Sequence, residues 1–131
     1  RSVTSAANHL TFYNPNGVVG SIQTNGSATV YNTSSDYRLK ENVTPIADAS
    51  NRLKALKPCR FNFIADATKT VDGFLAHEAQ TVVPEAVTGE KDGEEMQAID
   101  NSKLVPLLTA ALQEALTEIA KLKERVKNLE G

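Results

Sequence analysis

The last thirty residues carry an apolar pattern with a 3.5-residue period, and this pattern constrains the fold of the chain most strongly. Spacings of four and three residues alternate along it, and a stripe this narrow is best buried against copies of itself. The predicted seam consists of Leu108, Leu112, Ala115, Ile119, Leu122, Val126 and Leu129. We therefore expect a long C-terminal helix that joins several chains into an oligomer.

Charged residues beside the seam favour a parallel arrangement of these helices. Glu118 and Arg125 fall at g positions, and Lys123 and Glu130 fall at the e positions that follow them. Both g-to-e pairs have opposite signs when parallel chains are in register, which favours a parallel homo-oligomer. The core residues leave the number of strands open, because Ile and Val at a with Leu at d also suit dimers.

An alternative is an amphipathic helix packed on its own domain. It applies best to the start of the helix, residues 103–111, where Leu104 and Leu107 broaden the apolar stripe toward a globular core. We expect this part of the helix to pack within its own chain.

Composition argues against several classes of function. The 131 residues carry a net charge of −2 and no basic run, so we expect neither nucleic acid nor a membrane surface as partner. The longest apolar stretches are far shorter than a bilayer span. Cys59 is the one cysteine, so the sequence predicts no internal disulfide and no metal site. Aromatic residues make up only 5% of the chain, which favours a core pooled among subunits.

The amino-acid composition of the sequence changes near residue 35. Residues 1–34 are rich in Ser, Thr, Asn and Gly, and turn signals at Asn14–Gly17 and Asn25-Gly26 separate short β-branched runs. Strands this thin are typical of an intertwined fibrous stem rather than of a stable monomeric sheet.

A small mixed domain is predicted downstream, at residues 35–100. Residues 47–56 have a helical pattern that Pro58 ends, and residues 77–83 form a short helix candidate. Strands are expected at residues 59–64 and 71–76, with the polar segment 65–70 as the tip of a hairpin. Asp100, Asn101 or Ser102 can cap the final helix, which occupies the segment 101–131.

One motif contains residue types that could carry out a reaction, and it lies at the boundary between these two parts of the sequence. Ser35 precedes Lys40 by five residues, and on a straight helix or strand their side chains would point apart. Contact would need a turn or a neighbouring subunit. From the residues alone this is a solvated turn capped by Ser35 or Asp36.

The segment Ser-Asp-Tyr-Arg-Leu-Lys-Glu-Asn-Val, residues 35–43, resembles the opening motif of the S74 peptidase family. This family comprises intramolecular chaperone and auto-processing domains of bacteriophage tail fibres and tail spikes. Leu-Lys-Pro at 56–58, Gly-Phe-Leu-Ala-His-Glu at 73–78 and Ser-Lys-Leu-Val-Pro-Leu-Leu at 102–108 are similar to later landmarks, in family order. The resemblance covers residues 35–131.

The resemblance implies an α+β chain with three parts. Residues 1–34 would end an intertwined, triple-β-helix-like stem, residues 35–100 would form the chaperone and auto-processing domain, and residues 101–131 would form a parallel trimeric coiled coil. It also selects three strands over two. The implied partners are two further copies of the chain and the N-terminal fibre or spike portion of its own precursor. Assembly would take place in the host bacterial cytoplasm, and the domain would be released from the mature virion protein.

The resemblance also implies a serine-lysine dyad that acts without cofactor or metal. Ser35 would be the nucleophile, Lys40 the base, and the peptide joining Ser34 to Ser35 the bond that is cut. Asp36 and Arg38 match the motif as supporting residues, which could simply hold the turn. Backbone N–H groups or Asn42 are candidates for the oxyanion site. Cutting further upstream, near Ser2 or Ser5, is the alternative.

A serine-lysine dyad works only with a neutral lysine, because an ammonium cannot accept the hydroxyl proton. A free lysine has a pKa of about 10.4, and burial or a nearby cation such as Arg38 would lower it. We therefore hypothesise that assembly of the stem buries Lys40 and starts the cut. The rival is a non-catalytic trimeric fibre tip that fastens the stem or contacts a receptor. A third possibility is the related self-cleaving domain of myelin-regulatory-factor-type transcription factors.

Overall fold

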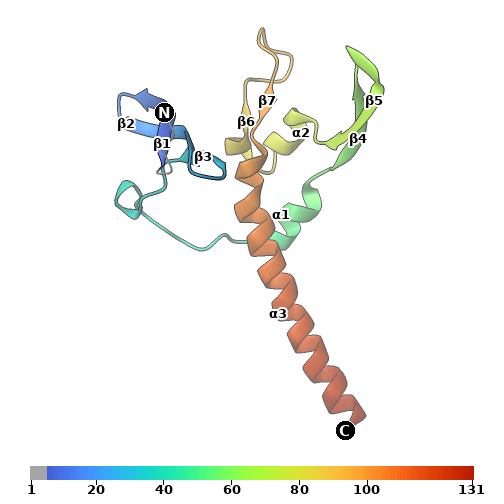
Figure 1. Cartoon of the computed structure of the whole chain (residues 1–131). Coiled ribbons are helices and arrows are strands. Elements are labelled where there is room, and N and C mark those ends of the chain that lie inside the picture. Colours follow the sequence, from blue (N-terminus) through green and yellow to red (C-terminus); the bar gives the residue numbers. More distant parts are fainter. Residues whose placement is uncertain (1–5) are drawn as a thin grey trace. The chain divides into compact units, whose positions relative to one another are not determined.

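The computed structural model describes residues 6–131 and has the mixed α+β composition that the sequence predicts, with small antiparallel sheets and a long C-terminal helix (Figure 1). The chain divides into two units, the first ending at Thr44 and the second running from Pro45 to Gly131.

The first unit is built on a three-stranded antiparallel sheet in the order β1-β2-β3. Its strands are β1 (Ala7–Asn14), β2 (Gly17–Thr24) and β3 (Thr29–Thr33), followed by a 3₁₀ turn, η1 (Tyr37–Leu39). Both predicted turns separate the strands. Gly17 takes up a φ of +103°, and the Asn25 side chain accepts hydrogen bonds from the backbone of Ser27 and Ala28.

This sheet buries almost nothing within one chain. Leu10 lies opposite Ile22, and Ile22 lies opposite Tyr31, so the three side chains share one face of the sheet. Leu10 and Tyr31 are 55% and 77% exposed, and Gly20 is the one buried residue among residues 6–44. An apolar face left this open agrees with the thin strands expected from the sequence.

The second unit joins three helices and two hairpins. Its elements are α1 (Ala49–Ala55), β4 (Cys59–Phe63), β5 (Asp66–Gly73), α2 (Ala76–Gln80), the 3₁₀ turn η2 (Pro84–Ala86), β6 (Val87–Thr88), β7 (Ala98–Ile99), the 3₁₀ turn η3 (Asn101–Leu104) and α3 (Val105–Glu130). β4 pairs with β5 and β6 pairs with β7, both antiparallel. Asp100 caps η3, as one of the three predicted caps, by accepting from the Ser102 backbone N–H.

The core of this unit is small and lies where α1, α2, η2 and the start of α3 meet. Its buried residues are Ala49, Leu56, Ala79, Val83, Ala86, Leu104, Leu107 and Ala111. The start of the long helix therefore packs within its own chain, as its broadened stripe predicts.

The predicted tip of the first hairpin is wrong. Residues 65–70 are mostly strand, because β5 already begins at Asp66 and the turn is confined to Ile64 and Ala65. Thr68 and Thr70 are β-branched and favour extended backbone despite their polarity. Asn62 also ties the strands together by donating to the carbonyl oxygen of Ala67 and to Thr70.

Beyond Ala111, α3 continues past α1 as a single helix (Figure 1). From Leu112 to Gly131, all of which the structure describes, no residue is buried in the isolated chain. The apolar residues exposed along this part include Leu112, Leu116, Ile119, Leu122, Val126 and Leu129. Leu108 is 46% exposed and Ala115 is exposed as well, so every residue of the predicted seam is open to solvent in the isolated chain. Leu116 adds to the stripe at the adjoining e position.

Candidate catalytic site

A short turn after β3 brings Ser35 and Lys40 together. β3 ends at Thr33, Ser34 still bonds to β2, and the chain then passes through an extended Asp36 into the 3₁₀ turn η1 before Lys40. Lys40 Nζ lies 2.7 Å from Ser35 Oγ and donates a hydrogen bond to it. The five-residue separation, which keeps these side chains apart on a straight helix or strand, is bridged by this turn.

Asp36 and Arg38 hold the turn in shape. Asp36 Oδ1 accepts from the Arg38 backbone N–H at 2.9 Å, which caps the first turn of η1. The guanidinium of Arg38 donates from Nε and Nη2 to the two carboxylate oxygens, each at 2.9 Å. The structure thus gives both residues a role in holding the loop that carries Lys40.

The electrostatics of the turn follow from the same contacts. The Arg38 side chain lowers the pKa of Asp36, and the Arg38 backbone N–H and the charge of Lys40 act in the same direction. Asp36 in turn raises the pKa of Arg38. The positive charge of Arg38 is therefore offset by Asp36 in the isolated chain.

The surroundings of Ser35 and Lys40 are open to solvent. Both residues are exposed, and so are the apolar side chains of Tyr37, Leu39 and Val43, with Tyr37 82% exposed. The isolated chain therefore offers Lys40 none of the burial that would favour a neutral amine. Apolar side chains exposed together beside this turn are typical of an interaction surface.

Ser34 is held by the sheet on the other side of the candidate bond. Its backbone N–H donates to the Val19 carbonyl oxygen at 3.0 Å, and its Oγ donates to the Val18 carbonyl oxygen at 2.9 Å. Asn42, a candidate for the oxyanion site, is exposed and has a φ of +52°, which Asn tolerates better than most residues. Ser2 and Ser5, the alternative cleavage region, lie outside the described residues.

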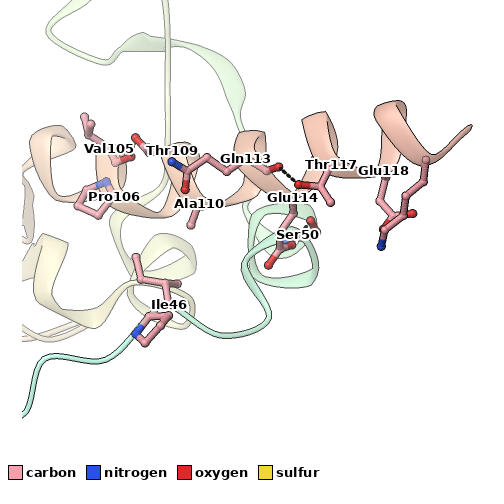
Figure 2. Close-up of a pocket in the computed structure, with 12 residues that line it drawn as sticks. Ile46, Ser50, Val105, Pro106, Thr109, Ala110, Gln113, Glu114, Thr117 and Glu118 are labelled. Carbon is pink, nitrogen blue, oxygen red and sulfur yellow. Dashed lines mark hydrogen bonds and ion pairs between the residues drawn. The ribbon is translucent and has the colours of Figure 1, made fainter. Parts of the chain in front are cut away.

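A second polar contact, in the second unit, joins α1 to α3 (Figure 2). Asp48, at the N-cap of α1, has a φ of +53° and makes no capping hydrogen bond with its side chain. Glu114 on α3 supplies the missing cap, because its carboxylate accepts hydrogen bonds from the Ser50 backbone N–H at 2.9 Å and from the Ser50 hydroxyl. The Ser50 hydroxyl, followed by its backbone N–H, lowers the pKa of Glu114.

This contact borders an open groove of about 920 Å³ on the outer face of α3. Pro45, Ile46 and Pro106 contribute apolar side chains to it. The groove residues of α3 fall mainly at b, c and f positions, so the groove faces away from the seam. Sequence reasoning missed the Ser50–Glu114 contact because its partners are 64 residues apart.

Two classes of site find no support in the described residues. Nowhere in residues 6–131 do three or more His, Cys, Asp or Glu side chains gather in an arrangement that could hold a metal ion. Of the helices in the same residues, none has both the length and the apolar character needed to cross a membrane.

Comparison with known families identifies the segment that contains the turn. Residues 35–88 match the model of the peptidase S74 family, described as the chaperone of endosialidase. A comparison with curated proteins gave no match. The matched segment begins at Ser35 and ends in β6, so it includes the Ser35–Lys40 contact and the motif at residues 73–78. The family description gives this matched segment a chaperone-type role, and the match supports, for residues 35–88, the similarity to the peptidase S74 family that the sequence motifs indicate.

Proposed function

We propose that this chain is an intramolecular chaperone that trimerises and folds the β-stem of a phage tail fibre or tail spike, and then releases itself by cutting the peptide between Ser34 and Ser35. The observation that carries the proposal is the 2.7 Å contact between Lys40 Nζ and Ser35 Oγ, directly after the last strand of the sheet. The family match that begins at Ser35 supports it.

The proposed reaction needs only the chain and water. Neutral Lys40 accepts the proton of the Ser35 hydroxyl while Oγ attacks the carbonyl carbon of Ser34. The C–N bond then breaks, the nitrogen of Ser35 takes a proton from the Lys40 ammonium, and an ester joins Ser34 to Ser35 Oγ. Water hydrolyses the ester, which leaves a carboxylate on Ser34 and a free amine and hydroxyl on Ser35.

The proposed trimer is what makes Lys40 competent. In the isolated chain Lys40 is exposed to solvent, so it lacks the dry surroundings that a lysine base needs. In a trimer, the first units of the neighbouring chains would cover the exposed Tyr37, Leu39 and Val43 and remove water from the turn. Cutting would then follow assembly and report it.

The proposed homotrimer also accounts for the open sheet of the first unit. Its apolar face, with Leu10, Ile22 and Tyr31, would pack against the same face of two further chains as part of an intertwined stem. The partner of the domain is thus the fibre portion of its own precursor. We place this assembly in the host bacterial cytoplasm, before the domain leaves the mature virion protein.

Mass spectrometry of a longer precursor, expressed with its stem, tests the proposal. The parent chain should yield a new N-terminus at Ser35, and Lys40→Arg should remain uncut while its trimers persist, because a guanidinium does not give up its proton. Lys54→Arg is the matched control, since Lys54 is an exposed lysine on α1, and it should be cut normally. Normal cutting of Lys40→Arg would overturn the dyad.

The rival function is a permanent trimeric fibre tip that fastens the stem or binds a receptor. The exposed apolar stripe of α3 favours it as much as it favours the chaperone, because both need a trimer. A parent precursor that folds into trimers and keeps its full length would establish this rival.

A further inference from the structure

The two sides of the candidate bond are held by different parts of the first unit. Upstream, Ser34 continues the pairing of β3 with β2 by one residue: its N–H donates to Val19, while Gly20 pairs with Thr33. The hydroxyl of Ser34 adds a second bond to β2, at the carbonyl oxygen of Val18. Ser34 is therefore tied to strand β2 by both its backbone and its side chain.

Downstream, the chain is held by the turn and not by the sheet. Asp36 bonds to the backbone and guanidinium of Arg38, and Lys40 bonds to Ser35 Oγ. The peptide between Ser34 and Ser35 thus lies between one anchor on the stem side and one anchor on the side of the released domain. A carbonyl between two fixed anchors has little freedom to move away from the attacking hydroxyl.

We propose that Ser34 is a positioning residue, whose hydroxyl bond to β2 fixes the position of the Ser34 carbonyl group. Pairing of β3 with β2 then aligns the Ser34–Ser35 peptide bond with Ser35 Oγ. The role rests on the proposed function. It adds a requirement that the dyad alone does not impose, namely that the end of the stem must be folded onto β2 before the bond is aligned.

The same two bonds survive the reaction. Neither involves the carbonyl carbon of Ser34, so the carboxylate formed by cutting stays on β2. The stem therefore keeps its last β2–β3 contacts when the downstream fragment leaves. An anchor of this kind allows release without opening the sheet.

The test measures cleavage rates of Ser34→Ala, Ser34→Thr and Asn32→Ala precursors after trimer formation. Ser34→Ala should be cut about three to ten times more slowly, the factor expected from the loss of one hydrogen bond during alignment. Ser34→Thr keeps the hydroxyl and should restore the rate. Asn32→Ala removes a comparable side-chain bond between β3 and β2, from Asn32 Nδ2 to Ser21 Oγ at 3.3 Å, and should be cut at the parent rate.

Thermal unfolding of the same variants, measured on the uncut Lys40→Arg background, separates positioning from stability. Ser34→Ala and Asn32→Ala should lower the unfolding temperature by similar amounts, while only Ser34→Ala slows cutting. Equal slowing by both variants, or a Ser34→Ala precursor cut at the parent rate, would overturn the positioning role. A parent precursor that is never cut at Ser35 would instead overturn the proposed function.

Discussion

Replacing Ile119 by aspartate should separate the chains and stop self-cleavage together. Ile119 occupies an a position in the middle of the predicted seam, and 48% of its surface remains exposed in the isolated chain. It lies beyond Ala111, the last buried residue of α3, so the substitution removes no buried side chain from the core of the second unit. Its effect should therefore fall on association.

The exposed fraction sets the size of this effect. Full burial of an isoleucine side chain is worth about 1.5–3 kcal/mol, so covering the remaining half contributes about 0.7–1.4 kcal/mol per chain. Three chains lose about 2–4 kcal/mol, which weakens the trimer about 30-fold to 1000-fold. Three unpaired carboxylates near one axis weaken it further, because burying a charge without a partner is costly.

Analytical ultracentrifugation and the cleavage time course measure both consequences. Thr117→Asp is the matched control: it puts the same charge on an exposed f position of the neighbouring turn, and it should leave trimers and cleavage intact. Circular dichroism should show that Ile119→Asp keeps its helix. A monomeric Ile119→Asp precursor that is cut at the parent rate would refute the link between assembly and cleavage.

Two further predictions concern the second unit, measured by urea unfolding on the monomeric Ile119→Asp background. Leu107 is 2% exposed, so Leu107→Ala should lower the free energy of unfolding by about 2–5 kcal/mol. Leu129 is 86% exposed, so Leu129→Ala should change the free energy of unfolding by less than about 0.5 kcal/mol. Similar losses at both sites would contradict the packing of α3. Glu114→Gln should destabilise the unit at pH 7. Ser50 lowers the pKa of Glu114 in the folded state, so as the pH falls the unfolded chain takes up the proton first. The loss of stability caused by Glu114→Gln should therefore be complete above pH 4.5, the ordinary pKa of the carboxyl group. It should vanish as the pH falls through the pKa of Glu114 in the folded state. A loss that does not change with pH would contradict the contact with Ser50.

Local patterns predicted the elements whose cause is local. The turns at Asn14–Gly17 and Asn25-Gly26 separate the strands as expected, since Gly and Asn supply the backbone conformations that tight turns need. Pro58 follows the end of α1, and Asp100 caps the turn that leads into α3. The exposed stripe from Leu112 to Leu129 follows from heptad spacing alone.

Features that depend on distant residues were not predictable in this way. The polar composition of residues 65–70 predicts a hairpin tip there, whereas in the structure cross-strand bonds from Asn62 to Ala67 and Thr70 hold this segment as a strand. The cap of α1 by Glu114 joins residues that no local pattern connects. The Ser35–Lys40 contact falls between these cases. The five-residue spacing allows a contact only if the chain turns, and the 3₁₀ turn η1 brings the two side chains together.

The contact between Ser35 and Lys40 cannot by itself control the timing of the cut, because it is already present in the isolated chain. Under the proposed function, control must therefore come from the surroundings of Lys40 and from the alignment of the carbonyl of Ser34. The first depends on burial, which the exposed turn lacks and a trimer can provide. The second depends on pairing of β3 with β2, which holds Ser34. Under the proposed function the two conditions are met together only when the chains are joined and the end of the stem is folded.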